Sequence, residues 1–176
     1  MQKISIRAME PEDWLAVRQM RLEALKSSPG LYALSYDEVA AWTAEYWQAE
    51  IKGDDHQVFG LFDRKDLIGI TAAFTWRGDA TGKTALLAMS YITPDYRGRG
   101  LSRKLYEARL NWIVEQPKFR KVMVGHRASN DISRRANQRH GFVPTTRIET
   151  YWPDGTVEDE IVYELVLDRK TSMKPR

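Results

Sequence analysis

The spacing of apolar residues predicts one strand and two helices in the first third of the chain. Residues 3–8 alternate apolar and polar side chains, which is the pattern of a half-buried strand. Apolar residues then recur at three- and four-residue steps from Pro11 to the Ser-Ser-Pro-Gly stretch at 27–30, which predicts a helix between these points. The same spacing returns over 37–52 and predicts a second amphipathic helix.

Alternating and continuous apolar runs in the rest of the chain predict a sheet. The expected strands cover residues 57–62, 67–76, 84–92, 121–126, 143–151 and 157–167. Polar, turn-rich segments separate the first three of these strands, so we expect an antiparallel meander there. Two further helices are expected, one after the loop at 93–99 and one over 130–140. The first of them joins two strands by a crossover, which implies that these strands pair in parallel.

These elements predict a single domain of the α/β (α+β) class. Their order is βααβββαβαββ, which gives a mixed, mostly antiparallel seven-stranded sheet flanked by helices. The chain has 176 residues, which is enough for one continuous core. We place the domain over residues 1–167 and expect a polar tail over 168–176.

Composition excludes several classes of protein. Hydrophobic residues make up 43% of the chain and charged residues 29%, as in folded proteins and unlike disordered ones. There is no run of about 18 apolar residues that would span a membrane, and the first residues lack the apolar core of a signal peptide. The chain has no cysteine, which excludes disulfides and Cys-based metal sites. We therefore expect a cytoplasmic protein without a membrane span and without a metal.

Positive charge is concentrated in one stretch of the chain. Residues 97–140 contain twelve Lys or Arg and three Asp or Glu, although the net charge of the whole chain is only +3. Such a stretch suits an anionic ligand, which would be either a nucleic acid or a phosphorylated cofactor. A nucleic-acid-binding module is the weaker alternative, because the aromatic residues are not interleaved with the basic ones and no zinc-finger spacing is present.

The segment Arg97-Gly98-Arg99-Gly100-Leu101-Ser102 has the composition of an anion-binding loop. It follows an expected strand and opens an expected helix. Glycines let the backbone approach a ligand, and free amides at a helix start bind anions with support from the helix dipole. A pyrophosphate would fit, although a Gly-rich turn with solvated arginines shows the same spacing. The sequence contains neither a Walker loop nor a first-strand G-x-G-x-x-G, which argues against P-loop and Rossmann proteins.

Two signatures resemble those of the GCN5-related N-acetyltransferase (GNAT) superfamily. Residues 92–102 are similar to the acetyl-CoA signature of that family, which contains (Q/R)-x-x-G-x-(G/A). Residues 130–142 resemble its second signature, N-x-x-(A/S)-x-x-x-Y-x-x-x-G-F. The two signatures stand in the family's order and at a suitable separation, and the order of elements resembles the family over nearly the whole chain.

The resemblance implies an enzyme that moves the acetyl group of its co-substrate acetyl-CoA to a primary amine by direct attack, without an acyl-enzyme. Residues 1–167 would then form an N-acetyltransferase domain. The pantetheine arm would enter between the strands at 84–92 and 121–126, and the loop amides would hold the pyrophosphate. The residues implied in cofactor binding are Ile92, Arg97, Gly98, Arg99, Gly100, Leu101, Ser102, Arg103, Asn130 and Asn137. A non-catalytic acyl-CoA-binding sensor on the same fold is the alternative.

The chain departs from the family pattern at the positions of proton transfer. Asn137 stands where many members carry a tyrosine that is thought to protonate the departing thiolate, and Leu86 stands where a general-base glutamate is often found. The candidates for catalysis are therefore His126, whose imidazole has a pKa suited to a base, together with Ser90 and Tyr91 at the end of the preceding strand. Each of these three would equally fit a packed structural residue.

Acidic residues give a hypothesis about the acceptor. The segment 31–55 holds six Asp or Glu against one Lys, and a second acidic cluster lies over 154–160. These carboxylates would attract a cationic amine, carried by a small molecule or a peptide, although a solvated helix face has the same composition. The acceptor, the acyl chain length and the oligomeric state stay open, with homodimers common among similar proteins.

Overall fold

The computed structural model describes residues 3–168. Of the tail expected over 168–176, only Asp168 lies within the described residues. The strands are β1 (Ile4–Ala8), β2 (Lys52–Gly53), β3 (His56–Asp63), β4 (Asp66–Thr75), β5 (Thr84–Ile92), β6 (Lys121–Arg127), β7 (Val143–Tyr151) and β8 (Val157–Val166). The α-helices are α1 (Trp14–Ser27), α2 (Tyr36–Ala40), α3 (Ala44–Ala49), α4 (Ser102–Glu115) and α5 (Asp131–Arg139), with 3-10 turns η1 (Pro11–Asp13) and η2 (Pro94–Tyr96).

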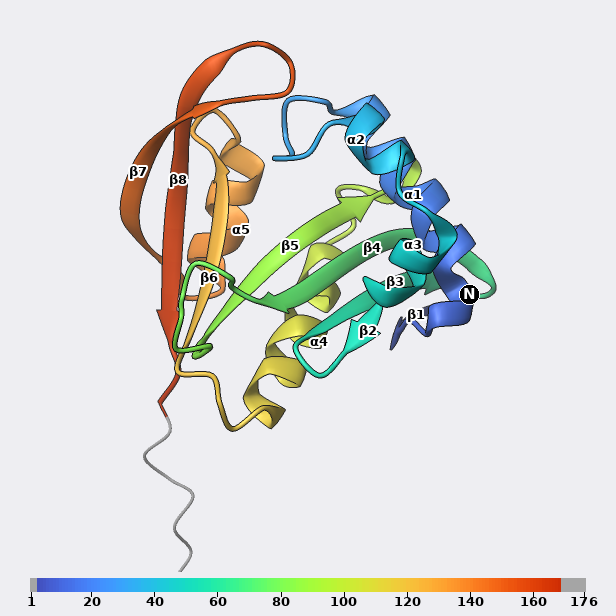
Figure 1. Cartoon of the computed structure of the whole chain (residues 1–176), viewed down its shortest axis with the longest axis horizontal. Helices are drawn as coiled ribbons and strands as arrows, with labels where there is room; N and C mark the ends of the chain where they lie inside the picture. The colour runs from blue at the N-terminus through green and yellow to red at the C-terminus, as the bar shows by residue number, and fades with distance from the viewer. Residues whose placement is uncertain (1–2, 169–176) are drawn as a thin grey trace, which may run out of the picture.

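The strands form one open sheet in the order β1-β3-β4-β5-β6-β8-β7 (Figure 1). Every neighbouring pair is antiparallel except β5 and β6, which are joined through α4. The predicted mixed, mostly antiparallel sheet and the single domain are therefore confirmed. The two-residue strand β2 pairs with β3 and brings the sheet to eight strands instead of the expected seven.

The segment expected as one helix over 37–52 is two short helices with a break between them. The Ser35 hydroxyl caps α2 by accepting from the backbone N–H of Glu38. The Thr43 hydroxyl caps α3 by accepting from the backbone N–H of Tyr46. A cap residue has an extended backbone, so the second cap ends the first helix and starts the next. The chain therefore bends over the sheet here.

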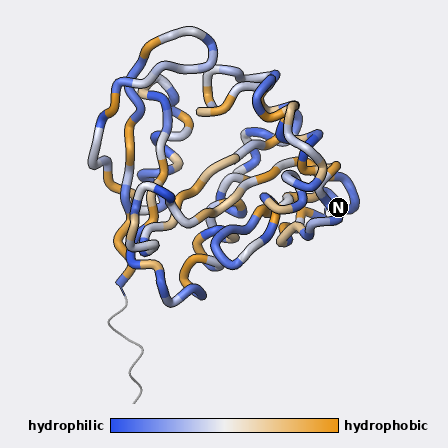
Figure 2. Tube along the Cα trace, viewed as in Figure 1, coloured by the Kyte–Doolittle hydropathy of each residue, from blue (hydrophilic) through white to orange (hydrophobic). Residues whose placement is uncertain are grey.

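Helices cover both faces of the sheet. On one face Val17 of α1 and Trp47 of α3 pack with Val58 of β3. On the other face Leu105 of α4 packs with Leu61 of β3. Figure 1 shows α1, α2 and α3 gathered over one half of the sheet and α4 behind it. Figure 2 shows that apolar segments follow the central strands, which places the core on both sides of the sheet.

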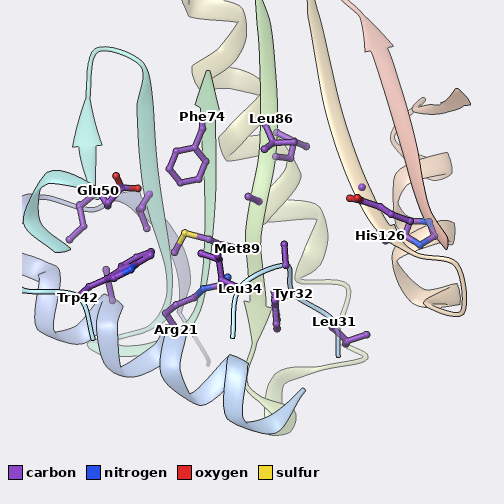
Figure 3. Close-up of a pocket in the computed structure, with 18 of the residues that line it drawn as sticks. Arg21, Leu31, Tyr32, Leu34, Trp42, Glu50, Phe74, Leu86, Met89 and His126 are labelled. Carbon is purple, nitrogen blue, oxygen red and sulfur yellow. The ribbon is translucent and has the colours of Figure 1, made fainter. Parts of the chain in front are cut away.

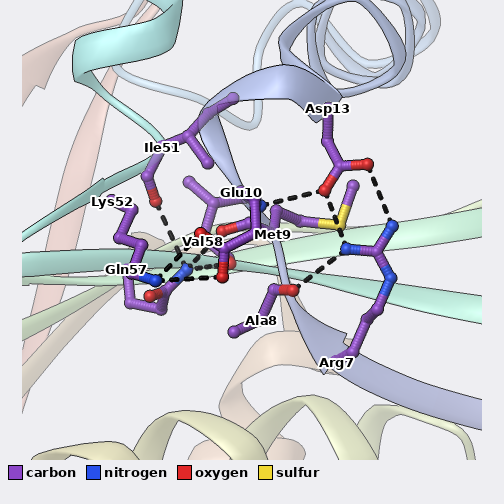
Figure 4. Close-up of polar contacts among 9 residues, drawn as sticks. All are labelled: Arg7, Ala8, Met9, Glu10, Asp13, Ile51, Lys52, Gln57 and Val58. Carbon is purple, nitrogen blue, oxygen red and sulfur yellow. Dashed lines mark hydrogen bonds and ion pairs between the residues drawn. The ribbon is translucent and has the colours of Figure 1, made fainter.

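A polar cluster fixes the start of α1 against the sheet (Figure 4). The Arg7 guanidinium donates to both carboxylate oxygens of Asp13, at 2.7 and 2.9 Å. Lys52 pairs with Glu10 at 2.8 Å. The buried Gln57 amide donates to the carbonyl of Met9 at 2.9 Å. These contacts join η1, β1 and β3, and so they set the position of the helix that lines the site described below.

Strands β5 and β6 diverge in the middle of the sheet. They pair in parallel only where Thr84, Ala85 and Leu86 face residues 121–123. Beyond that point β5 carries a bulge opposite β4, and Met89 takes a left-handed backbone with φ of 59°. The divergence leaves a gap in the sheet at 87–90, which is the splay that the family resemblance implies. No helix between residues 3 and 168 has the length and apolar character that crossing a membrane requires.

Candidate active site

The loop between β5 and α4 has a backbone that only glycine adopts readily. Gly98 and Gly100 have φ of 72° and 73°, and a Cβ built on either of them would meet no atom within 4 Å. Space is therefore not the reason for glycine here. The left-handed conformation is the reason, because it costs an L-residue about 1–2 kcal/mol. The open space above both Cα atoms also leaves the backbone accessible to a ligand.

The loop presents amides and cations to one site. The N–H groups of Gly98, Gly100, Leu101 and Ser102 have no acceptor among residues 3–168, and they stand at the start of the 14-residue helix α4. Such amides, aligned with the positive end of the helix dipole, bind anions.

Arginine side chains brace the same loop. The Nε of Arg97 donates to the carbonyl of Ile92 at 2.8 Å. Arg99 donates to the carbonyl of Asp95 at 2.7 Å, and Arg103 to Glu107 at 2.6 Å. The first two bonds hold the loop in shape, whereas the Arg103 pair lies within α4. The loop therefore combines backbone amides that residues 3–168 leave unpaired with nearby arginines, which are the features that an anion site requires.

Asn137 of α5 is buried with its side-chain donor unused within the described residues. Its side chain is 1% exposed, and its Oδ1 accepts from the Tyr106 hydroxyl of α4 at 2.5 Å. Its Nδ2 is buried and has no partner among the described residues. Asn130, the other predicted contact in this helix, caps α5 by accepting from the backbone N–H of Ser133 at 3.1 Å. Asn130 thus positions the helix that carries Asn137.

A cavity of about 340 Å³ opens on the other face of the sheet, where α1, α3 and residues 31–34 roof β5, β6 and β8. Its walls are largely apolar, and Leu86 and Met89 belong to its floor (Figure 3). Leu86, at the position of the family's usual glutamate, therefore contributes no carboxylate. Titratable side chains reach the cavity from elsewhere in the chain. They are Arg21, Tyr32, Glu50, His126 and Glu160.

The three catalytic candidates from the sequence do not converge. His126 lines the cavity but both ring nitrogens have partners, the Arg127 carbonyl at 2.7 Å and the Tyr163 hydroxyl at 3.1 Å. The Tyr91 hydroxyl faces α1 and donates to Glu23 at 2.8 Å. Ser90 faces α4, where its hydroxyl accepts from the fully buried Arg109 at 2.9 Å.

Arg21 is a buried cation that pairs with no anion among residues 3–168. Its side chain is 6% exposed, and no described residue accepts a hydrogen bond from its Nη1. Burial lowers the pKa of its guanidinium to about 10, so it stays charged at neutral pH. The spacing of Val17, Arg21 and Leu25 is a signal that could have revealed this residue, since it puts one arginine in the apolar stripe of α1.

Glu160 supplies a carboxylate from β8. It lines the cavity, and burial raises the pKa of its carboxyl above the usual value. Gly125 on the neighbouring strand makes room for it, because a Cβ there would lie 2.1 Å from Glu160 Oε1. Glu50, at the end of α3, brings a second carboxylate. The sequence placed both glutamates in acidic clusters but gave no reason to single them out.

The other acids of the last hairpin are already occupied. The Arg127 guanidinium pairs with Asp154 at 2.7 Å and with Glu158, and it donates to the carbonyl of Gly30 at 3.0 Å. Hydrogen bonds from Thr156 and Arg127 lower the pKa of the Asp154 carboxyl to about 2. This cluster therefore ties the hairpin to the roof of the cavity and has little charge left for a ligand.

Comparison with known proteins gives a family and a fold. The model of the acetyltransferase (GNAT) family matches residues 14–142. A GNAT acetyltransferase from Streptococcus pneumoniae is 19% identical over 94% of this chain and 100% of its own, with a TM-score of 0.80. The ribosomal-protein-S18-alanine N-acetyltransferase of Escherichia coli is 19% identical over 97% of this chain and 99% of its own, with a TM-score of 0.70. Arabidopsis thaliana NAA60, solved with acetyl-CoA, is 16% identical over 94% and 99%, with a TM-score of 0.72. No curated protein matches the sequence.

Proposed function

Because the chain belongs to the GNAT family of acetyltransferases, we propose that it transfers the acetyl group of acetyl-CoA to a primary amine. One observation carries this proposal. The gap between β5 and β6 has the anion-binding loop at one end and the cavity on one face. A long anionic thioester held by the loop can therefore present its acyl end to an amine in the cavity.

Residues of the loop and the gap fit acetyl-CoA. The amides of Gly98, Gly100, Leu101 and Ser102 have no acceptor within residues 3–168 and would hold the diphosphate. The β5 backbone from Met89 to Ile92 lies beyond the last residues paired with β6, and it would pair with the pantetheine amides. The solved neighbour NAA60 was determined with acetyl-CoA, which supports the assignment of the ligand. When bound, acetyl-CoA supplies an activated acyl group on a thiol leaving group.

The chemistry needs a proton acceptor for the amine and a donor for the departing sulfur. The amine nitrogen forms a bond to the acetyl carbon, the carbon–sulfur bond breaks, and the amine loses a proton. Glu160 is the proposed proton acceptor, because burial raises the pKa of its carboxyl toward the working range of a base. Asn137 cannot release a proton, but its unused Nδ2 can donate a hydrogen bond to the sulfur. Tyr106 holds Asn137 in position through Oδ1.

A charge reversal in the loop tests the proposed cofactor site. Arg99→Glu places an anion beside the diphosphate, so we expect acetyl-CoA to bind at least about 10-fold more weakly by calorimetry. Arg147→Glu makes the same charge change on the exposed strand β7, and it should leave the affinity within about 2-fold. Equal affinities for Arg99→Glu and wild type would remove the loop from the proposal.

Turnover separates the enzyme from the sensor alternative. With acetyl-CoA and a panel of primary amines, an acetyltransferase releases the CoA thiol only when an amine is present, and the acetylated amine appears in the mass spectrum. A sensor binds acetyl-CoA and releases no thiol with any amine.

A further inference from the structure

The cavity roof contains a buried positive charge for which residues 3–168 supply no anion. Arg21 is 6% exposed and lines the cavity, and its Nη1 has no acceptor in the described part of the chain. A buried charge without a partner is costly to the folded state. Figure 3 shows the side chain reaching from α1 toward Leu34 and Met89, into the space between the roof and the strands.

A second unused donor lines the same cavity. Trp47 of α3 is 1% exposed, and its indole Nε1 has no acceptor among residues 3–168. Buried indole N–H groups usually have a hydrogen-bond partner. Two buried donors without acceptors, one of them charged, indicate that the missing partner is a ligand with oxygen acceptors and a negative charge.

Two contacts place this cation beside the reacting end of the gap. The guanidinium carbon of Arg21 lies 4.5 Å from the centre of the Tyr32 ring. The Tyr32 hydroxyl in turn donates to the carbonyl of Ser90 at 3.1 Å. Ser90 adjoins Met89, where β5 bulges. One aromatic ring therefore separates the cation from the strand segment at which the proposed function places the acyl group.

On the basis of the proposed function, we propose that the acceptor is a small amino acid whose carboxylate binds Arg21 while its amine faces the acyl group. Glu50 from the end of α3 and Glu160 from β8 also line the cavity, so the site has charges for both ends of a zwitterion. Its volume of about 340 Å³ lies near the lower limit of ligand pockets. Apolar side chains make up most of the remaining lining (Figure 3) and favour an apolar amino-acid side chain. They include Leu31, Leu34, Trp42, Phe74 and Leu86.

The test compares acceptors that differ only in the carboxylate. Phenylalanine, phenylalaninamide and phenethylamine share one ring, and a Phe-Asp peptide amide carries its carboxylate on the next residue. Binding is measured by calorimetry with CoA present, and acetylation by thiol release. We expect phenylalanine to exceed both carboxylate-free amines in kcat/KM by at least about 30-fold, as for a buried hydrogen-bonded charge pair.

Variants of Arg21 test whether this residue causes the preference for phenylalanine over the carboxylate-free amines. Arg21→Met keeps the apolar stem and removes the charge, so kcat/KM for phenylalanine should fall to within about 3-fold of that for phenethylamine in the same variant. Arg21→Lys keeps the charge but loses the planar fork, and it should retain part of the preference. Arg18→Met removes an arginine of the same helix, which donates to the carbonyl of Ala40, and should keep the wild-type preference. Arg21→Met should unfold at or above the wild-type temperature, because it removes an uncompensated buried charge.

The outcomes separate this inference from the proposed function. Equal use of phenylalanine and phenylalaninamide, a preference for the acidic peptide, or an unchanged preference in Arg21→Met would each overturn the inference. So would failure of wild type to bind any of the amino acids leucine, phenylalanine and tryptophan. In all these cases acetyl-CoA binding and amine-dependent thiol release would still stand. Failure to bind acetyl-CoA at all would overturn the proposed function instead.

Discussion

Replacement of Gly100 by alanine probes the loop through its backbone alone. A Cβ at this position meets no atom within 4 Å, so the new methyl group clashes with nothing in the free protein. The cost comes from the left-handed φ of 73°, which is about 1–2 kcal/mol for an L-residue. For a chain of this size that loss corresponds to a drop of about 2–8 °C in the unfolding temperature.

The loop can also relax in the free protein and avoid part of this strain. The strain then returns when acetyl-CoA requires the original backbone, and the affinity falls by about 5- to 30-fold for the same 1–2 kcal/mol. The assay therefore measures both quantities, unfolding by differential scanning calorimetry and acetyl-CoA affinity by titration calorimetry. The loss in the free energy of unfolding and the loss in the free energy of acetyl-CoA binding should add to at least about 1 kcal/mol.

Gly155 provides the matched control. It has a φ of 82°, and a Cβ there also meets nothing within 4 Å, but it lies in the turn between β7 and β8. Gly155→Ala should lower the unfolding temperature by a similar amount and leave acetyl-CoA affinity unchanged. If Gly100→Ala bound acetyl-CoA as tightly as Gly155→Ala does, the loop would not be the diphosphate site and the reasoning would fail.

Three further predictions concern the gap and the last hairpin. Glu160→Gln should lower kcat about 100-fold, as expected for loss of a general base. Burial raises the pKa of Glu160 above its usual 4.5, so wild type loses stability as the pH rises from 4.5 through the raised pKa. The variant should therefore be the more stable protein at pH 7, as measured by urea denaturation. Tyr106→Phe should lower kcat about 10-fold in steady-state assays with unchanged acetyl-CoA affinity, because one hydrogen bond that positions Asn137 is lost; an unchanged kcat would contradict this role. The pKa of Asp154 is lowered from 3.8 to about 2, so its contribution to stability is full above the usual value and disappears as the pH falls to about 2. Arg127→Met should reduce this loss of stability at acid pH. The free energy of unfolding of wild type and variant is measured by urea denaturation across this pH range, and equal losses in the two proteins would contradict the prediction.

The spacing of apolar residues was enough to predict the layers of the fold, because most elements carry a regular apolar stripe. The strands alternate where one face is buried, and the crossover through α4 required β5 and β6 to be parallel. The same spacing gave a wrong prediction over 37–52, where one helix was expected. The apolar spacing continues through 41–43, but Thr43 caps a new helix there. The balance between a side-chain cap and one more helical turn depends on the sheet beneath, which periodicity does not report.

The backbone conformation of the loop at 97–102 could be predicted because its residues are contiguous. Positive φ at Gly98 and Gly100 is a local property of the loop, and glycine spacing indicates it. The cavity could not be predicted in the same way, because Arg21 and Glu160 lie far apart in the sequence. They line one cavity only after α1 packs on the sheet and β8 pairs with β6. The divergence of β5 from β6 and the bulge at Met89 depend on strand pairing that no single segment specifies.

The most direct test of the account is amine-dependent release of the CoA thiol by the purified full chain. Acetyl-CoA is supplied at a concentration that raises the unfolding temperature, since a ligand at 100 times its dissociation constant adds about 2.7 kcal/mol. For an acetyltransferase, the CoA thiol should appear only when an amine is added. Its amount should equal that of the acetylated amine found by mass spectrometry. Stabilisation by acetyl-CoA without thiol release for any amine would contradict the assignment as an acetyltransferase and would favour a binding protein on the same fold.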